Sequence, residues 1–161
     1  MKIIEEEFWK KPEFPTLFVI TTNNVIEDDR LVMGAGVAKE ARDRISGLDS
    51  ECARKIEEYQ FEHQNEKGIK KEYGFLVVRY PIGGKNGVAI LQTKKHFDED
   101  SPLALVAYSI KKMSEWVAKN PNIPVRMVYP GIGHGNLSEG DVEPLLNMYL
   151  SKFENVVICK K

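Results

Sequence analysis

The 161-residue sequence has little of what marks several specialised classes of protein. It contains two cysteines, Cys52 and Cys159, with no CxxC spacing and no neighbouring histidine cluster. A zinc site or a disulfide framework is therefore not expected, and a reducing cytoplasm fits this composition. No apolar run approaches the roughly 20 residues of a membrane-spanning helix, and Met1–Glu7 lacks the apolar core of a signal peptide. We expect a cytoplasmic protein without membrane contacts.

The sequence also lacks an excess of charge of either sign. Lys and Arg total 23 and Asp and Glu total 24, which gives a formal net charge of -1. Nucleic-acid-binding domains usually show a clearly basic domain or stripe, so an anionic ligand here must be held by backbone N–H groups and helix ends. The length, the absence of repeats and the absence of a long linker predict one domain over residues 1–161, and we expect a monomer.

Apolar patterns predict alternating strands and helices. Short apolar runs bounded by turn residues predict strands at Leu17–Thr22, Phe75–Tyr80, Val88–Gln92, Val125–Tyr129 and Val156–Lys160, with an additional edge strand at Lys2–Trp9. Helical spacing predicts helices over Ala35–Ile45, Asp49–His63 and Ser138–Leu150. It predicts a fourth helix with Ser101 as its cap residue and Pro102 in its first turn, which Pro121 ends. The buried face expected for this fourth helix is Leu103, Val106, Ala107, Ile110, Met113 and Val117. Residues 23–32 read as a polar connection.

This alternation predicts a three-layer α/β/α sandwich with a mixed, mostly parallel central sheet of about six strands. The Gly-rich connector over residues 81–87 predicts a hairpin between two of them. In such sheets, ligands bind beyond the carboxyl ends of the strands. Two glycine-rich segments, residues 33–36 and 131–135, follow predicted strands and precede predicted helices.

Both glycine-rich segments have the chemistry of an anion site. Glycine lets the backbone approach a ligand closely, and successive free N–H groups followed by a helix N-terminus attract negative charge. Gly131, Gly133 and Gly135 alternate directly after a strand, which suits a diphosphate. Gly34 and Gly36 open a helix, where backbone would meet a sugar or a second phosphate. The alternative is that both are only tight turns.

Two better-known phosphate loops do not match. No Gly-Lys-Ser/Thr follows Gly131–Gly135, so the segment is not a Walker loop. In the segment 34–39, Lys39 occupies the place of the third glycine of a dinucleotide-binding fingerprint.

The order of these segments resembles the macrodomain family. The resemblance is carried by Val19-Ile20-Thr21-Thr22-Asn23-Asn24, by Val32-Met33-Gly34-Ala35-Gly36-Val37-Ala38, and by Tyr129-Pro130-Gly131-Ile132-Gly133-His134-Gly135. It extends from about residue 17 to 160 and is most similar to the branch of terminal ADP-ribose–protein glycohydrolases and related bacterial and phage proteins. It implies a macrodomain-like fold over residues 1–161 and ADP-ribose as the ligand.

The resemblance implies a site in two parts. In that family the first loop surrounds the distal ribose and the second binds the diphosphate. The residues expected near the ribose are Thr22, Asn23, Asn24, Met33, Gly34, Ala35, Gly36, Val37 and Ala38. Those expected near the phosphates are Pro130, Gly131, Ile132, Gly133, His134, Gly135 and Asn136. No metal and no cofactor is expected.

Catalysis is less clearly implied than binding. By resemblance, Lys94 matches a strand-end lysine of the glycohydrolase branch, and His134 could donate to phosphate or protonate a leaving group. The aspartate that this branch carries after the second loop has no close match. Asp141 is the nearest acid, and its spacing from Ser138 is that of a helix capping box.

Three hypotheses follow from these residues. The first is a module that binds ADP-ribose or a derivative through two glycine-rich loops and reads ADP-ribosylated protein or nucleic acid. The second is a hydrolase with Lys94 and His134 as candidate catalytic residues, acting on ADP-ribosylated macromolecules or on ADP-ribose 1″-phosphate. The third is a binding module for another nucleotide or a protein partner.

Overall fold

The computed structural model describes residues 1–160 and contains a six-stranded sheet at its centre. The strands are β1 (Lys2–Ile4), β2 (Leu17–Thr22), β5 (Phe75–Arg79), β6 (Gly87–Gln92), β7 (Val125–Val128) and β8 (Val156–Cys159). Their order in the sheet is β1-β8-β7-β2-β6-β5. All neighbouring pairs are parallel except β5 with β6, which are antiparallel and form the predicted hairpin. The mixed, mostly parallel sheet predicted from the sequence is confirmed.

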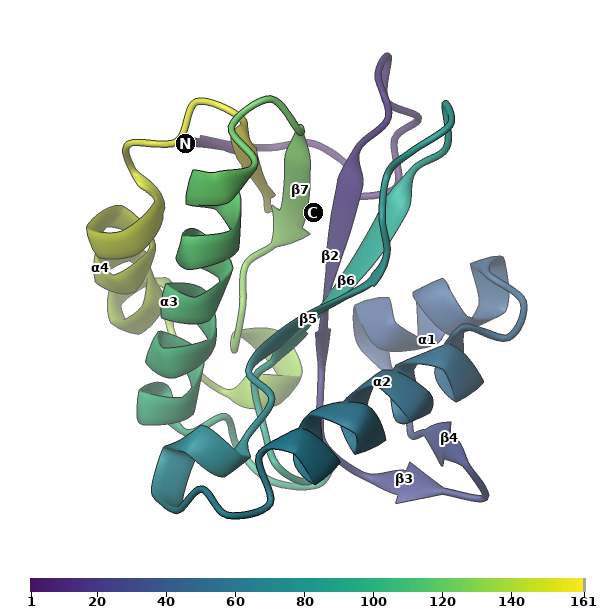
Figure 1. Ribbon diagram of the computed structural model, residues 1–161. Helices are drawn as coiled ribbons and strands as arrows, with labels where there is room; N and C mark the ends of the chain where they lie inside the picture. Colours follow the sequence, from purple (N-terminus) through teal and green to yellow (C-terminus); the bar gives the residue numbers. More distant parts are fainter. Residues whose placement is uncertain (161) are drawn as a thin grey trace.

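Helices cover both faces of this sheet, as Figure 1 shows. On one side lie α1 (Gly36–Arg44) and α2 (Leu48–Glu62), and on the other lie α3 (Leu103–Lys119) and α4 (Glu139–Leu150). Two short 3-10 turns, η1 (Gly68–Lys71) and η2 (Gly133–Gly135), lie in connections. The three-layer α/β/α architecture is therefore confirmed.

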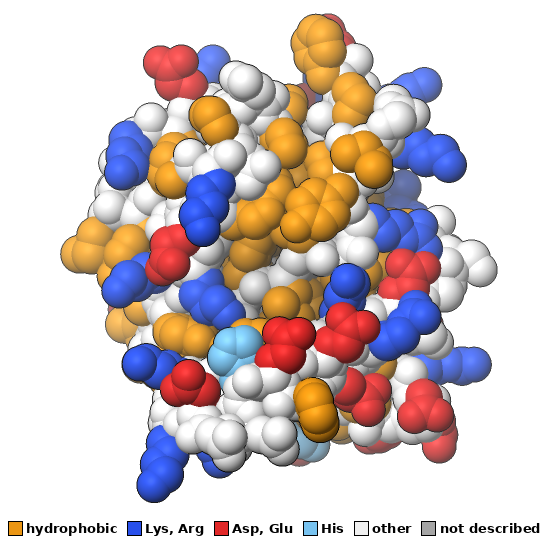
Figure 2. Space-filling view, viewed as in Figure 1, with side chains coloured by type: hydrophobic (Ala, Val, Ile, Leu, Met, Phe, Trp, Pro, Cys, Tyr) orange, Lys and Arg blue, Asp and Glu red, His pale blue; other side chains and the backbone are white. Residues whose placement is uncertain are grey.

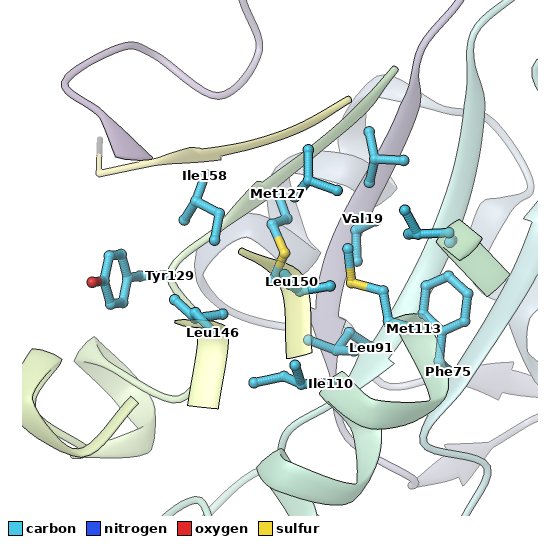
Figure 3. Packing of buried hydrophobic residues seen from close by; sticks show 14 of the residues in the cluster. Val19, Phe75, Leu91, Ile110, Met113, Met127, Tyr129, Leu146, Leu150 and Ile158 are labelled. Atoms are coloured by element: carbon cyan, nitrogen blue, oxygen red, sulfur yellow. The ribbon is translucent and has the colours of Figure 1, made fainter. Parts of the chain in front are cut away.

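The central strand β2 has its side chains buried on both faces of the sheet. Leu17 and Val19 pack into the cluster shared with α3 and α4, whereas Phe18 and Ile20 pack toward α1 and α2. Figure 3 shows Val19 and Leu91 packed together with Met113 and Leu150 in the first of these clusters. This two-sided burial explains why β2 is a continuous apolar run and not an alternating one.

Three local predictions are corrected by the structure. Leu103 is 42% exposed, because the buried face of α3 is rotated to include Leu105 and Ser109. The N-cap of α3 is Pro102 and not Ser101, and no side chain caps this helix. The expected edge strand ends at Ile4 instead of Trp9.

The connection over residues 23–32 contains a small hairpin that the sequence patterns did not predict. Its strands are β3 (Ile26–Glu27) and β4 (Arg30–Leu31), and they pair antiparallel. Asp28 and Asp29 at its tip have φ angles of 52° and 62°, a left-handed conformation that aspartate tolerates. Within residues 1–160, no helix is long and apolar enough to cross a membrane.

A buried tyrosine holds the carboxyl end of β2 in place. Tyr73 is fully buried, and its hydroxyl donates to the carbonyl oxygen of Asn23 at 2.5 Å. The same hydroxyl lies 2.6 Å from Oγ1 of Thr22. Burial raises the pKa of Tyr73 far above its ordinary value, so the phenol stays neutral and keeps its proton for this bond.

Tyr73→Phe should lower the free energy of unfolding by about 1–3 kcal/mol, because it leaves the buried Asn23 carbonyl without a donor. Urea unfolding of the wild type and the variant measures this difference. Tyr149→Phe, a partly buried tyrosine on α4, is the control and should cost clearly less. Equal costs for both variants would contradict the anchoring role of the Tyr73 hydroxyl.

Candidate functional site

A cleft of about 700 Å³ lies at the carboxyl ends of the central strands. Cys159 at the end of β8, Val128 of β7, Thr22 of β2 and Thr93, directly after β6, all line it. The cleft therefore spans four adjacent strands, and three inter-strand spacings of about 4.8 Å give it a length of roughly 14 Å. Its position is the one where open α/β sheets bind ligands.

The first glycine-rich segment forms one wall of this cleft. Gly34, Ala35 and Gly36 are exposed and line it, and α1 starts at Gly36, so the N-terminus of this helix lies at the cleft. Met33 does not line the cleft, because its side chain is 2% exposed and packs in the core with α1 and α2.

The second glycine-rich segment forms a closed loop opposite the first. The backbone N–H of Leu137, two residues after the segment, donates to the carbonyl oxygen of Gly131 at 2.9 Å, which closes the loop on itself. Gly131 has a φ angle of 80°, a conformation that strains any residue with a Cβ. The ring of His134 lies against Gly36, with its Cδ2 3.6 Å from where a Gly36 Cβ would be. The two glycine-rich segments thus meet across the cleft.

The connection between β6 and α3 fixes the second loop from outside. Nζ of Lys94 donates to the carbonyl oxygen of His134 at 3.0 Å, and the backbone N–H of Ser101 donates to the carbonyl oxygen of Gly135 at 2.9 Å. The side-chain amide of Asn136 donates to Asp100 at 2.6 Å. These three bonds join residues 94–101 to residues 134–136, so the loop is held without a ligand.

Ser101 approaches the second loop so closely that only glycine fits opposite it. A Cβ on Gly135 would lie 2.4 Å from Oγ of Ser101. This explains the last glycine of the loop by packing, independently of any ligand.

Most residues predicted to form the site lie together in the cleft. Those that line it are Thr22, Asn23, Gly34, Ala35, Gly36, Val37, Ala38, Lys94, Gly131, Ile132, His134, Gly135 and Asn136. Gly133 starts the turn η2 between them. Asn24, Met33 and Pro130 are not among the lining residues. The amide of Asn24 donates instead to Glu72 at 3.1 Å.

The side chain of Asn23 has a structural task in the loop that follows β2. Its Nδ2 donates to the carbonyl oxygen of Val32 at 3.0 Å, and its Oδ1 accepts from the N–H of Val25 at 2.9 Å. These bonds bring the first glycine-rich segment back to the end of β2.

Several lining residues were not predicted. They are Phe8, Thr21, Val32, Glu40, Thr93, Phe97, Asp98, Glu99, Asp100, Ser101, Val128, Tyr129, Cys159 and Lys160. The run Asp98-Glu99-Asp100 follows the end of β6 closely, and that position in a parallel sheet was a usable signal. Phe8 gave no such signal, because tertiary packing alone brings it to the cleft.

The cysteine and tyrosine in the cleft are uncharged at neutral pH. Burial raises the pKa of Cys159, so its thiol is a poor nucleophile. Burial and the nearby Glu143 and Glu139 raise the pKa of Tyr129 to about 12. Among residues 1–160, no group of three or more His, Cys, Asp and Glu side chains is arranged to hold a metal ion.

Asp141 caps a helix. Its carboxylate accepts from the N–H of Ser138 at 3.0 Å, and its own N–H donates to Oγ of Ser138 at 3.2 Å. This is the capping box that its spacing suggested. Asp141 is not among the residues that line the cleft.

Ser138→Ala should lower the free energy of unfolding by about 1 kcal/mol, because the start of α4 loses its cap.

Asp141→Asn should show a distinctive pH dependence. Hydrogen bonds from the Ser138 backbone and hydroxyl lower the pKa of Asp141 below its ordinary value of 3.8. The ionised Asp141 carboxylate therefore stabilises the folded state fully above pH 3.8. This stabilisation is lost as the pH falls through the lower pKa that Asp141 has in the folded protein. Urea unfolding at pH 7 and at pH 2–3 measures the difference in free energy of unfolding between the wild type and Asp141→Asn. This difference should shrink in acid, and a difference that grows in acid would contradict the prediction.

Comparison with known proteins identifies the fold. No protein-family profile matches the sequence, and no curated protein matches it significantly. Among solved structures, the macrodomain of Thermus aquaticus DarG superimposes with a TM-score of 0.76 and 19% identity, over 99% of this chain and 97% of that one. The macrodomain of Mycobacterium tuberculosis DarG gives 0.71 and 18%, over 99% and 97%. Thermosipho africanus DarTG in complex with ADP-ribose gives 0.64 and 18%, over 90% of this chain and 38% of that one. The resemblance inferred from the glycine-rich motifs is confirmed at the level of the fold.

Proposed function

We propose that this chain, which has the macrodomain fold, is a single macrodomain that binds ADP-ribose or a close derivative in the cleft between its two glycine-rich segments. One observation carries the proposal: both segments and the strand-end polar residues line one cleft of suitable length in this fold. A solved structure with the same fold, Thermosipho africanus DarTG, is a complex with ADP-ribose.

The two ends of the cleft differ in chemistry, and this gives the ligand a direction. Phe8, Val128 and Cys159 give the end at β7 and β8 an apolar wall, where Lys160 is paired with Glu139, and such a wall suits an adenine ring. Thr22 and Lys94 make the end at β2 and β6 polar, which suits a ribose. The second loop follows β7, which is paired with β2, so it would lie beside the diphosphate between these two ends.

Backbone groups would supply most of the binding to the diphosphate. Only two lysines, Lys94 and Lys160, are among the described lining residues, and Nζ of Lys160 lies 3.3 Å from Glu139. Residues 94–101 hold the second loop in place. This loop and the N-terminus of α1 present backbone N–H groups, which can bind an anion without a net positive surface. This preorganisation lowers the entropy cost of binding.

Gly34→Ala should reduce ADP-ribose affinity at least about tenfold without loss of stability. No protein atom lies within 4 Å of a Cβ at Gly34, so the methyl group meets only the space assigned to ligand. Titration calorimetry gives the affinity, and thermal unfolding without ligand gives the stability.

Gly140→Ala is the matched control, since it adds a methyl group on α4 at ordinary van der Waals distance, 3.6 Å, from Ser138. It should bind ADP-ribose like the wild type.

AMP, which lacks the second phosphate and distal ribose, should raise the melting temperature less than ADP-ribose at the same concentration. Unchanged affinity in Gly34→Ala, or equal shifts with both ligands, would favour another nucleotide as the ligand.

A second candidate function is hydrolysis of an ADP-ribose linkage, which the position of Lys94 favours. Its amine lies in the cleft at the end assigned to the distal ribose, 3.0 Å from the carbonyl of His134. A neutral lysine amine there could attack the anomeric carbon as the bond from this carbon to the attached group breaks, with water then releasing the ribose from the lysine. It could instead orient a water molecule that displaces the same group. His134 lines the same part of the cleft and is the other candidate for proton transfer.

We expect the wild type to bind ADP-ribose without releasing it from ADP-ribosylated protein, ADP-ribosylated DNA or ADP-ribose 1″-phosphate. Lys94→Ala should weaken binding modestly, because the second loop loses one of its three outer bonds. Release of ADP-ribose or phosphate is followed by chromatography. Turnover that Lys94→Ala abolishes while ADP-ribose still binds would establish the hydrolase instead.

A further inference from the structure

We infer that the segment Phe97–Ser101 selects what is attached to the distal ribose, and that it favours a guanidinium group, as in an ADP-ribosylated arginine side chain. This inference rests on the proposed function, because it assigns the distal ribose to the end of the cleft next to Lys94. The segment lines the cleft and follows Lys94 closely in the chain.

The charges of the cleft are opposite to those an anionic ligand alone would require. Its described lining includes the carboxylates of Glu40, Asp98, Glu99 and Asp100, against the amines of Lys94 and Lys160. Three of these carboxylates are consecutive in the chain. By comparison, Figure 2 shows Asp and Glu side chains interspersed with Lys and Arg on one face of the molecule.

The protein itself does not neutralise this acidic run with lysine or arginine. Within residues 1–160, no lysine or arginine side chain lies within 4.0 Å of the carboxylates of Asp98, Glu99 or Asp100, and the imidazole of His96 lies against Asp98. Glu99 accepts instead from the N–H groups of Lys95 and His96, and Asp100 from the neutral amide of Asn136. Asp98 is 73% exposed, so its carboxylate is accessible at the cleft.

Ser101 provides an independent sign that a polar group is missing from this part of the cleft. The residue lines the cleft and is only 4% exposed, yet its Oγ has no hydrogen-bond partner within residues 1–160. Buried hydroxyls are nearly always paired. Ser101 lies next to Asp100 and against Gly135, where the second loop meets the acidic segment.

A guanidinium group fits these features better than other substituents of the ribose. It is planar, permanently charged and carries several N–H donors, so it can pair with the carboxylates of Asp98 and Asp100. Phe97, which is 46% exposed and lines the same cleft, offers an aromatic face on which it can stack. A phosphate or carboxylate at this position would meet like charge.

The test compares the affinities of two conjugates that differ only at this position. ADP-ribosylarginine should bind the wild type at least about tenfold more tightly than ADP-ribose 1″-phosphate, measured by calorimetry in low salt. Asp98→Asn/Asp100→Asn should narrow this ratio to within about threefold. Asparagine keeps an oxygen that can accept from Asn136, so the substitution removes charge and preserves this bond.

Asp28→Asn/Asp29→Asn is the matched control, because these two neighbouring aspartates are exposed on the β3–β4 turn and do not line the cleft. It should leave the ratio as in the wild type. A ratio near one in the wild type, or one that Asp98→Asn/Asp100→Asn leaves unchanged, would overturn the inference. Free ADP-ribose, titrated in parallel, separates the two levels: if it binds while the ratio fails, only the selection is wrong, and if it does not bind, the proposed function is wrong.

Discussion

The parallel pairing of β2 with β6 on one side and β7 on the other is the constraint on which the rest of the structure depends. Leu17 pairs with Gly87 of β6 and with Val125 of β7, so the three strands run in the same direction through the centre of the sheet. Their carboxyl ends consequently meet at one edge. Both glycine-rich segments and Lys94 follow such ends, although they are far apart in the chain. The cleft results from this register.

The cleft is shaped before any ligand enters it. Three hydrogen bonds join residues 94–101 to the second loop, and a fourth closes the loop between Gly131 and Leu137. Tyr73 fixes the end of β2 from within the core. A loop with several glycines would otherwise lose much conformational entropy on binding. The proposed binding site is therefore supported by side chains that no ligand needs to touch, and substitutions there would affect affinity through loop position.

The same connection that fixes the second loop also carries the acidic run beside it. Backbone N–H groups attract an anion over a short range. The carboxylates of Asp98 and Asp100 would instead attract or repel, by charge, the group attached to the distal ribose. The two effects are compatible because they apply to different parts of one ligand. Under the proposed function, a cleft with more carboxylates than lysines would hold a diphosphate through backbone N–H groups and discriminate by charge at the other end.

The sequence alone determined the architecture and the two glycine-rich segments that line the cleft. Apolar runs and helical spacing located the six strands and four helices, because burial on both faces of a sheet imposes a pattern that local residues record. Glycines at strand-to-helix junctions indicated two of the segments that line the cleft. The Ser138–Asp141 capping box was also visible, since a cap depends on residues three positions apart.

Tertiary structure decided the remaining features. Phe8 reaches the cleft, and Met33 leaves it for the core, through packing between segments that no local pattern relates. The rotation of α3 that exposes Leu103 depends on which face meets the sheet. The partners of Lys94, Asp100 and Ser101 lie more than 30 residues away along the chain. A sequence pattern records the environment of each residue over a few neighbours, whereas these contacts exist only after the parallel strands have aligned their ends.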